Sequence, residues 1–202
     1  MNLIVFFNGW GMGEEVIKNI KIPNGYKFIN ISYPYNFNKK ILEEYDEINF
    51  IGWSFGVYYL SKFINLNREI KYNKIISING TPEIIGENGI PENIFYLTLK
   101  NMDEENFKKF QKNSGLKIEI KKDISFLIEE LKELRENYSS QKNFISISII
   151  GKKDRIIPYR NQKRYYKKTN TKVIEIPIKH NPFNYFKSWE EILKIGEIEN
   201  GF

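Results

Sequence analysis

A serine between two glycines is the strongest chemical signal in the sequence. Ser54 lies in the pattern Gly52-Trp53-Ser54-Phe55-Gly56, directly after a strand-length apolar run and before a segment of helical period. The G-x-S-x-G pattern is typical of a nucleophile elbow, a strained strand-to-helix turn without room for side chains two residues before and after the serine. We therefore expect the Ser54 hydroxyl to lie at the end of a strand, where the N-terminus of the next helix stabilises negative charge.

A serine nucleophile needs a base to take its proton and an acid to orient that base. His180 is the only histidine in the chain, and it follows the last predicted strand, where the chain order Ser, Asp, His places the base. Asp154, directly after the fifth predicted strand, is the expected acid. Asp123 is the alternative, although its position ahead of Ile124 is that of a helix N-cap.

Acyl transfer of this kind also needs backbone N–H groups that stabilise a developing oxyanion. One donor usually belongs to the residue after the nucleophile, here Phe55, and the other to the loop after the first strand. Asn8-Gly9-Trp10-Gly11 is that loop; its glycines let the backbone approach a reacting carbonyl, and Trp10 can donate its N–H. We expect Trp10, Trp53 and Phe55 to form an apolar entrance for an acyl chain.

The hydrophobic pattern predicts the elements that position these residues. Apolar runs of strand length, several nearly continuous as in buried parallel strands, lie at 3–7, 28–32, 48–53, 74–78, 144–150 and 172–176. Segments of helical period separate most of them. Together with the elbow and the chain order, this alternation predicts an α/β-hydrolase fold with a mostly parallel sheet of about six strands and helices on both faces.

One connection is longer than a crossover requires. About 63 residues separate the fourth and fifth predicted strands, with turn signals up to Pro91 and then predicted helices at 104–112 and 124–137. We expect residues 81–142 to form a helical excursion over one edge of the sheet that acts as a lid, within a single domain spanning residues 1–202. A long ordinary crossover is the alternative.

Composition removes several other functions. The 202 residues are 41% hydrophobic and 28% charged, which is enough apolar material for a buried core and excludes disorder. Without cysteine, the chain has no disulfide, zinc finger, thiolate nucleophile or iron–sulfur site, and one histidine argues against a histidine-rich metal cage. We expect no metal and no cofactor. No apolar run has the length of a membrane span or signal segment, so we expect a soluble, cytoplasmic protein.

Five motifs distributed over nearly the whole chain resemble those of the BioG-type pimeloyl-acyl-carrier-protein methyl ester esterases of biotin synthesis. They are Phe6-Phe7-Asn8-Gly9-Trp10-Gly11-Met12, Gly52-Trp53-Ser54-Phe55-Gly56-Val57, Ile78-Asn79-Gly80-Thr81, Gly89-Ile90-Pro91 with Phe95 and Thr98, and His180-Asn181-Pro182-Phe183. The resemblance implies a triad of Ser54, Asp154 and His180, with the N–H groups of Trp10 and Phe55 as the oxyanion hole. It also implies a carboxylesterase that hydrolyses the methyl ester of pimeloyl carried on acyl carrier protein, its partner.

The net charge of +6 is concentrated in one segment. Between residues 152 and 172, nine basic residues and one acid give +8. We expect the helix after the fifth strand to dock the acidic carrier protein. The basic residues of that helix are Arg160, Lys163, Arg164 and Lys167; the alternative docking residues, in the helical excursion, are Lys108, Lys109 and Lys112.

Two other functional classes remain open on the residues alone. The first is another α/β-hydrolase activity, such as a thioesterase or a small-ester lipase, because specificity depends on the pocket and the lid rather than on the triad. The second is a non-catalytic basic binding protein for nucleic acid, which the combination of elbow, single histidine and ordered aspartate disfavours. We expect a monomer with no nucleic-acid or membrane partner.

Overall fold

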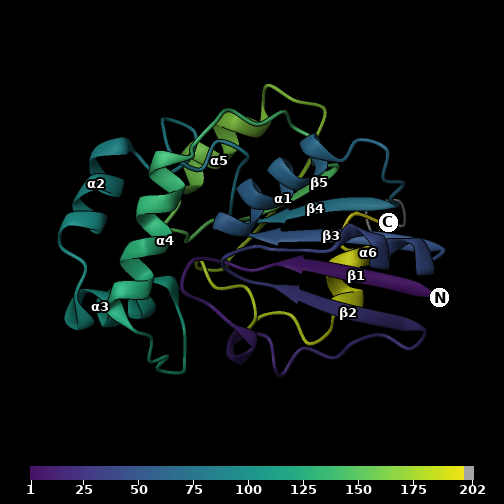
Figure 1. The fold of residues 1–202 in the computed structure, drawn as a ribbon, viewed down its shortest axis with the longest axis horizontal. Helices are drawn as coiled ribbons and strands as arrows, with labels where there is room; N and C mark the ends of the chain where they lie inside the picture. Colours follow the sequence, from purple (N-terminus) through teal and green to yellow (C-terminus); the bar gives the residue numbers. More distant parts are fainter. Residues whose placement is uncertain (198–202) are drawn as a thin grey trace.

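A six-stranded parallel sheet lies at the centre of the computed structural model, which describes residues 1–197 (Figure 1). Its order is β2-β1-β3-β4-β5-β6, and every neighbouring pair is parallel. The strands are β1 (Asn2–Phe7), β2 (Tyr26–Ile31), β3 (Glu47–Trp53), β4 (Lys74–Ile78), β5 (Ile147–Gly151) and β6 (Lys172–Ile176). The predicted α/β class and sheet are confirmed.

Helices cover both faces of this sheet, which explains why most positions of the central strands are apolar. On β1, Leu3 and Val5 pack in the core cluster that contains residues of α1 (Phe55–Leu66) and α5 (Tyr159–Tyr166). Ile4, between them, packs in the other cluster, with residues of α6 (Trp189–Lys194). Successive side chains of a strand point to opposite faces, so a strand buried on both sides is apolar throughout.

The long connection after β4 forms three helices beyond the carboxyl ends of the strands (Figure 1). They are α2 (Glu92–Lys100), α3 (Glu104–Ser114) and α4 (Ile124–Glu136). The side chains of Asp103 and Asp123 cap α3 and α4 by accepting backbone N–H groups of the first turn. Two short 3-10 helices, Glu14–Val16 and Lys39–Glu44, lie in the connections before β2 and β3.

Helix α2 was not among the predicted helices. Pro91, which we interpreted as part of a turn, is the N-cap of α2, and the helix begins directly after it. Three apolar residues of α2, namely Ile94, Tyr96 and Leu97, are exposed, so the helix lacks the one-sided apolar pattern from which helices are predicted. None of the helices in residues 1–197 combines the length and apolar character that crossing a bilayer requires.

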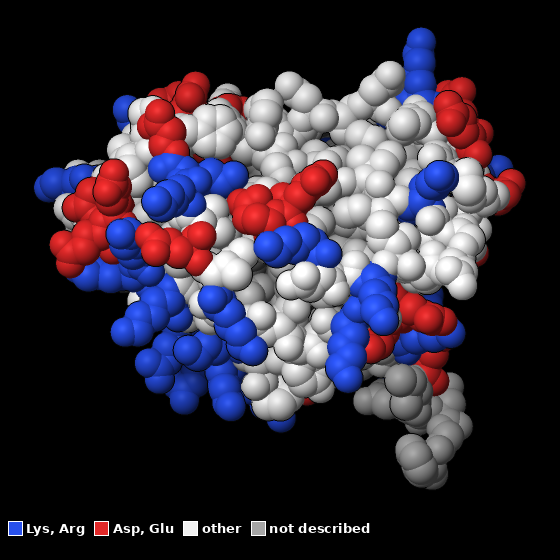
Figure 2. Space-filling view, turned by 90° about the horizontal axis from the view of Figure 1, so that it is seen from below, with Lys and Arg blue, Asp and Glu red and all other residues white. Residues whose placement is uncertain are grey.

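Basic side chains gather at the end of the molecule that carries the helical excursion. Figure 2 shows Lys and Arg clustered at that end beside several Asp and Glu, a largely uncharged middle, and charges of both signs at the opposite end. The lysines of α3 and of the connection to α4 belong to this end: Lys108, Lys109, Lys112, Lys117, Lys121 and Lys122.

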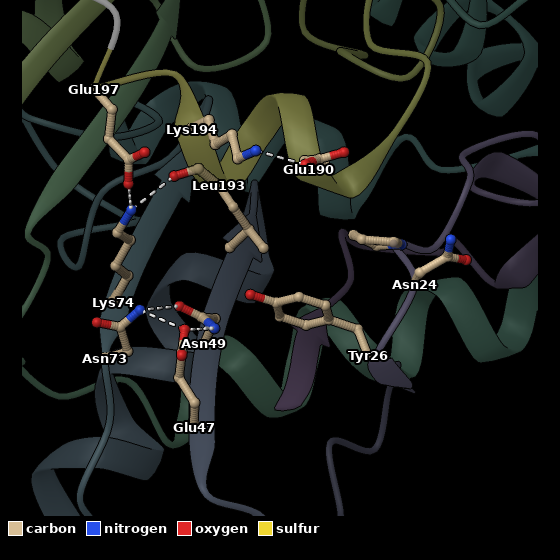
Figure 3. A pocket seen from close by; sticks show the side chains of 11 residues that line it. Asn24, Tyr26, Glu47, Asn49, Asn73, Lys74, Glu190, Leu193, Lys194 and Glu197 are labelled. Carbon is tan, nitrogen blue, oxygen red and sulfur yellow. Dashed lines mark hydrogen bonds and ion pairs between the residues drawn. The ribbon is translucent and has the colours of Figure 1, made fainter. Parts of the chain in front are cut away.

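The amino-terminal edge of the sheet carries a cavity of about 370 Å³ with a mainly polar lining (Figure 3). Asn73 Nδ2 donates to Glu47 Oε1 at 2.7 Å and to Asn49 Oδ1 at 3.1 Å. Lys74 Nζ donates to the Leu193 carbonyl at 3.0 Å. These polar groups therefore bond to one another, and the residues that line this cavity include none of the predicted catalytic ones.

The aromatic core under α6 gives a first prediction. Trp189 is 1% exposed, and its ring centroid lies 4.9 Å from that of Phe6 and 4.8 Å from that of Phe28. Trp189→Ala is expected to lower the free energy of unfolding by about 3–5 kcal/mol, because it leaves a large cavity. Urea denaturation measures the loss. Leu66→Ala, at a 71% exposed position, is the control and should change stability by less than about 0.5 kcal/mol.

Candidate active site

Three side chains from separate loops form one hydrogen-bonded line at the carboxyl edge of the sheet. The ring nitrogen Nε2 of His180 lies 2.9 Å from Ser54 Oγ, and Nδ1 lies 2.9 Å from Asp154 Oδ2. Exposed fractions are 4% for Ser54, 5% for Asp154 and 1% for His180. A carboxylate on Nδ1 fixes the imidazole tautomer that has its lone pair on Nε2, facing the hydroxyl.

Ser54 occupies the strained turn that the glycine pattern predicts. Its φ is 56° and its ψ is −123°, between the end of β3 and the first residue of α1. A Cβ at Gly56 would lie 2.0 Å from the Phe7 carbonyl oxygen, and one at Gly52 would lie 2.9 Å from the Gly56 carbonyl oxygen. Backbone atoms fill both places, so neither glycine can be replaced without moving the turn.

Asp154 is oriented by four hydrogen-bond donors. Its Oδ1 accepts the backbone N–H groups of Ile156 at 2.9 Å and Ile157 at 3.2 Å. Its Oδ2 accepts Gln162 Nε2 at 2.9 Å and faces the imidazole. Four donors on two oxygens satisfy the hydrogen-bonding capacity of a carboxyl group that is withdrawn from water. Asp123, the alternative acid, instead accepts the N–H of Ser125 as the cap of α4.

The loop that carries His180 is held by Asn79, at the end of β4. Asn79 Nδ2 donates to the carbonyls of Lys179 at 2.9 Å and His180 at 2.8 Å. Its Oδ1 accepts the N–H of Gly151, the last residue of β5, at 2.6 Å. Asn79 has φ 47°, a conformation that asparagine tolerates better than most residues. One buried amide thus joins the ends of β4 and β5 to the histidine loop.

Two backbone N–H groups beside Ser54 are free to bind an oxygen. Among residues 1–197, neither the N–H of Trp10 nor that of Phe55 has a hydrogen-bond partner. The loop containing Trp10 passes directly beside the serine, since a Cβ at Gly9 would lie 3.2 Å from Ser54 Cβ. The Trp10 indole Nε1 donates to the Leu127 carbonyl at 3.1 Å, so only the backbone N–H of Trp10 is unpaired. Unpaired N–H groups beside a nucleophile are the arrangement of an oxyanion hole.

Ser54 opens into a cavity of about 120 Å³ with a predominantly apolar lining. The cavity is smaller than the polar one at the opposite edge, but it is the one in contact with the hydrogen-bonded line. Its other lining residues come from the loops around the site and from all three helices of the excursion: Trp10, Phe55, Ile90, Ile94, Phe95, Thr98, Phe110, Leu131, Arg155 and Ile156.

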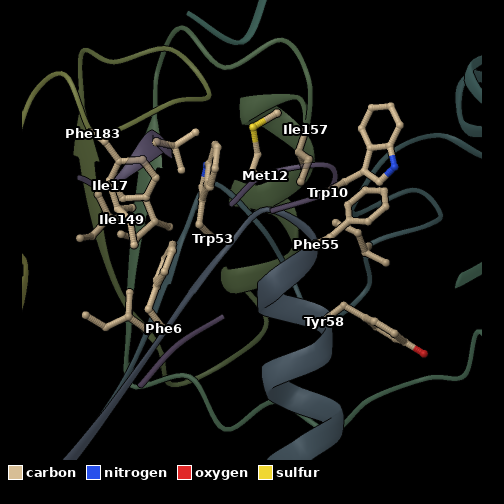
Figure 4. Packing of buried hydrophobic residues seen from close by; sticks show 14 of the residues in the cluster. Phe6, Trp10, Met12, Ile17, Trp53, Phe55, Tyr58, Ile149, Ile157 and Phe183 are labelled. Atoms are coloured by element: carbon tan, nitrogen blue, oxygen red, sulfur yellow. The ribbon is translucent and has the colours of Figure 1, made fainter. Parts of the chain in front are cut away.

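Trp10 and Phe55 line this cavity as expected, but the expectation for Trp53 was wrong. Figure 4 shows Trp53 on the side of Phe6 and Phe183, away from Trp10 and Phe55. Its ring centroid lies 5.0 Å from that of Phe183, and its Nε1 donates to the His180 carbonyl at 2.9 Å. Alternate residues of a strand face opposite sides, and Trp53 shares the α6 side with Ile51. Trp53 therefore contacts the histidine loop from the α6 side of the sheet instead of lining the cavity.

The predicted docking residues lie on two separate helices. On α5, Lys163 pairs with Glu175 at 2.8 Å, and Arg164 donates to the Glu87 carbonyl. Arg160 is on the same helix, and Lys167 is its C-cap. The pairing lowers the pKa of the Glu175 carboxyl and raises that of the Lys163 ammonium.

On α3, Lys108 pairs with Glu119 at 3.3 Å and Lys109 with Glu105 at 2.7 Å. The Lys112 ammonium has no partner among the described residues. The carboxyl end of α3 also contacts the histidine loop, because the N–H of Asn181 donates to the Ser114 carbonyl at 2.8 Å. Both basic helices therefore reach the site: α3 through Ser114 at the histidine loop, and α5 through Gln162 at Asp154.

Known proteins show the same fold. The crystal structure of BioG from Haemophilus influenzae superposes with a TM-score of 0.83 at 23% identity, over 94% of this chain and 93% of that one. A pyrethroid hydrolase from Sphingobium faniae JZ-2 gives a TM-score of 0.63 at 12% identity, over 98% of this chain and 96% of that one. The sheet, the elbow and these neighbours define an α/β-hydrolase.

Within that class, the sequence profile of the family described as "Pimeloyl-ACP methyl esterase BioG" matches residues 1–192. The chain belongs to this family, and the resemblance inferred from the five motifs is confirmed. A malonyl-[acyl-carrier protein] O-methyltransferase from Bacteroides fragilis (strain 638R) is 33% identical over 181 residues, which are 82% of this chain. They are only 36% of that protein, so the chain spans about a third of the length of this relative.

The sequence analysis did not identify the residues that hold Ser54, His180 and Asp154 in place. Gln162 and Asn79 were not assigned a role, although Asn79 lies in one of the quoted motifs. An asparagine followed by glycine at a strand end signals a turn with positive φ, and that signal was available. Its bonds to Lys179 and His180, 100 and 101 positions away in the sequence, had no such signal. Among residues 1–197 no group of three or more His, Cys, Asp and Glu side chains is arranged to hold a metal ion.

The role of Asn79 can be tested by kinetics. Asn79→Ala removes both donors to the histidine loop, and we expect kcat for an activated short-chain ester to fall about ten- to a hundredfold with little change in KM, because the imidazole loses its position. Asn143→Ala is the matched control. Asn143 also bonds to two partners, Thr171 Oγ1 and the Ile145 N–H, but precedes β5 at the opposite end of the sheet. Equal kcat in both variants would contradict the role.

Proposed function

We propose that this chain is a serine carboxylesterase with Ser54 as nucleophile, His180 as general base and Asp154 as the group that orients the base. Ser54 Oγ attacks the ester carbonyl while His180 Nε2 takes its proton, and the N–H groups of Trp10 and Phe55 bind the oxyanion. The imidazolium then protonates the departing alcohol. The single observation that carries this proposal is the continuous line Ser54–His180–Asp154, with both contacts at 2.9 Å.

The second half of the reaction uses the same residues. Water enters in place of the alcohol, His180 takes one of its protons, and the hydroxide attacks the acyl-Ser54 carbonyl. Collapse of the second tetrahedral intermediate releases the carboxylic acid and returns the proton to Ser54. Burial of Asp154 supports this cycle, because a buried negative charge stabilises the imidazolium that forms twice in each turnover.

The substrate we propose is the methyl ester of pimeloyl carried on acyl carrier protein, with release of methanol. Family membership supports this substrate, and so does the apolar lining of the cavity at Ser54, which suits a methylene chain. The name of the B. fragilis relative describes an O-methyltransferase that acts on malonyl-[acyl-carrier protein]. A transferase of that kind makes a methyl ester on a carrier-bound acid, the type of bond this site would cleave.

The same relative makes one distinction necessary. Nearly two thirds of its length has no counterpart in this chain, which spans 36% of that protein. We assign the methyltransferase activity to that remaining part and the hydrolytic activity to the part that this chain matches. The hydrogen-bonded line at Ser54 supports the second assignment, since nucleophile, base and orienting acid all lie in this chain.

Residues 81–142 act as a lid in this proposal, within a single domain. All three helices of this helical excursion contribute side chains to the cavity at Ser54, for example Phe95 of α2, Phe110 of α3 and Leu131 of α4. An apolar cover of this kind excludes water from the acyl chain and strengthens hydrogen bonds to the oxyanion.

For the carrier protein we propose docking on α3 rather than on α5. Helix α3 turns Phe110 toward the cavity and carries Lys108, Lys109 and Lys112, and the Lys112 ammonium has no partner among the described residues. A partner on this helix lies next to the opening through which its acyl group must pass. Each helix has two basic side chains that already bond within the protein, Lys108 and Lys109 on α3 and Lys163 and Arg164 on α5, so the choice rests on the cavity, which α3 lines and α5 does not. Complementary charge on the carrier increases the rate of encounter.

Removal of the nucleophile tests the reaction. Ser54→Ala is expected to lower kcat for an activated short-chain ester by about 10⁴-fold or more, because no acyl-enzyme forms. Ser139→Ala, at an exposed position after α4, should behave like the wild type. Hydrolysis by Ser54→Ala at the wild-type rate would refute the mechanism.

The substrate is tested with pimeloyl methyl ester on acyl carrier protein and mass spectrometry of the product. Release of methanol with the thioester intact is the expected result. Cleavage of the thioester instead would identify a thioesterase. In cells, the chain should restore growth without biotin to a strain that lacks its own pimeloyl ester esterase.

Charge reversal tests the docking helix. The double variant Lys108→Glu, Lys112→Glu should raise KM for the carrier-bound ester about tenfold and leave kcat/KM for an activated short-chain ester unchanged. The matched control reverses two exposed charges on and after α5, Arg160→Glu with Lys167→Glu. If the control raises KM and the α3 variant does not, docking belongs to α5.

A further inference from the structure

One buried carboxyl group near the site has no role in the proposed reaction. Glu130 lies on α4, is 0% exposed, and reaches the loop after β1. Its Oε2 accepts the N–H of Gly11 at 3.1 Å, and its Oε1 lies 3.2 Å from the Tyr35 hydroxyl. The same hydroxyl lies 3.0 Å from the Asn8 carbonyl oxygen. Glu130 thus contacts the residue that follows the proposed oxyanion donor Trp10.

Counting hydrogens identifies the protonation state that this arrangement requires. The Tyr35 hydroxyl has one hydrogen, but two oxygens, Asn8 O and Glu130 Oε1, lie within bonding distance of it. If Glu130 carries a proton on Oε1, it donates to the tyrosine oxygen, and the tyrosine donates to Asn8. Every polar atom is then satisfied, including the Gly11 N–H on Oε2. If Glu130 is ionised, one of the two acceptors has no hydrogen.

Burial of the Glu130 side chain also favours the neutral carboxylic acid. It raises the pKa of Glu130 to about 8, with a smaller contribution from the Glu133 charge, while the Gly11 N–H, the Tyr35 hydroxyl and Lys122 act against it. Burial raises the pKa of the Tyr59, Tyr33 and Tyr35 phenols, and the charge of Glu130 raises each of them further. The phenols therefore stay neutral when Glu130 ionises, and Lys122 is the one cation among these groups.

Helix α4 holds the same loop at other points. The Trp10 indole donates to the Leu127 carbonyl, one turn before Glu130. Gly11 has φ +66°, and a Cβ there would lie 2.5 Å from Leu127 Cδ2, so helix and loop are in close contact. A negative charge on Glu130 would stand one residue from the N–H that binds the oxyanion, and in a buried site that repulsion is poorly screened.

We propose that Glu130, as a neutral carboxylic acid, is a positioning residue that joins the helical excursion to the oxyanion loop and holds the Trp10 N–H in its catalytic place. This inference rests on the proposed function, in which that N–H stabilises the oxyanion. It also explains why an acid is buried at this position. A neutral carboxylic acid holds the loop of Trp10 and Gly11 by hydrogen bonds and adds no negative charge beside the developing oxyanion.

Two substitutions at Glu130 distinguish loss of the ionisable group from loss of its hydrogen bonds. Glu130→Gln keeps an acceptor for the Gly11 N–H and supplies an N–H donor to Tyr35, so kcat for an activated ester at pH 7 should stay within about threefold of the wild type. Glu130→Leu removes both contacts, and we expect kcat to fall about tenfold or more with KM nearly unchanged. Glu129→Leu, at the exposed neighbouring position, is the control. Wild-type kcat in Glu130→Leu overturns the proposal.

The pH profile gives a readout that loss of packing would not produce. The wild-type kcat should fall as pH rises through about 8, where Glu130 ionises. In Glu130→Gln this fall should be absent, because an amide does not ionise. Superimposable profiles in the two proteins overturn the proposal.

Two measurements do not depend on catalysis. Amide hydrogen exchange at Gly11 should be faster in Glu130→Leu than in the wild type, Glu130→Gln and Glu129→Leu, because the N–H has lost its acceptor. Glu130 has its pKa raised above the ordinary 4.5, so the folded state holds a proton that the unfolded chain releases, and the contribution of this group to wild-type stability falls between pH 4.5 and about 8. The Tm of Glu130→Gln should therefore increase relative to the wild type from pH 5 to pH 8.

These readouts distinguish the two proposals. If the wild type and Ser54→Ala hydrolyse the ester equally, the proposed function fails, and Gly11 exchange still reports whether Glu130 holds the loop. If hydrolysis depends on Ser54 but Gly11 exchanges at the same rate in Glu130→Leu and Glu129→Leu, the proposed function stands and the positioning role is wrong.

Discussion

The close approach of helix α1 to the ends of strands β1 and β4 is the constraint on which the site depends. A side chain at Gly56 would overlap the Phe7 carbonyl at 2.0 Å, and one at Gly80 would lie 2.7 Å from the Ser54 carbonyl. Because backbone packs directly on backbone, the chain must turn sharply between β3 and α1, and Ser54 takes a φ of 56°. The same proximity brings the loop after β1 beside the serine, so one packing contact sets both the nucleophile and the place where an oxygen can be bound.

Two sets of buried polar contacts then hold the remaining groups. At the strand ends, Asn79 and the Trp53 indole both donate to the His180 carbonyl, and Gln162 of α5 donates to Asp154. From the side of the helical excursion, Leu127 and Glu130 of α4 bond to Trp10 and Gly11. The imidazole is therefore positioned mainly by strand ends and the oxyanion loop by a surface helix. A buried polar network of this kind adds specificity of geometry, since each donor left without a partner would cost about 1–3 kcal/mol.

The parts of this arrangement that were predictable from sequence are those with a local signal. Strands buried on both faces gave continuous apolar runs, and the glycines around Ser54 gave the elbow. The position of His180 followed from its being the only imidazole after the last strand. Contacts between distant residues gave no such signal: Gly11 and Glu130 are 119 positions apart. The helical period places Glu130 on the apolar face with Leu127, Leu131 and Leu134, but it does not show which residues that face contacts. The face of the sheet on which Trp53 lies was wrongly predicted for a related reason. An aromatic residue beside a nucleophile lines the pocket only if the alternation of the strand places its side chain on the pocket side.

The presence of one histidine in 202 residues has a practical consequence for spectroscopy. The ring of His180 is buried with one nitrogen on a hydroxyl and the other on a carboxylate, each at 2.9 Å. In a uniformly ¹⁵N-labelled sample, every imidazole nitrogen resonance therefore arises from this ring and needs no assignment by mutagenesis. Its chemical shifts distinguish the two tautomers and the doubly protonated form. A single pH titration followed by NMR therefore gives the protonation state of His180 between Ser54 and Asp154, and the titration can be repeated with an inhibitor or a partner bound.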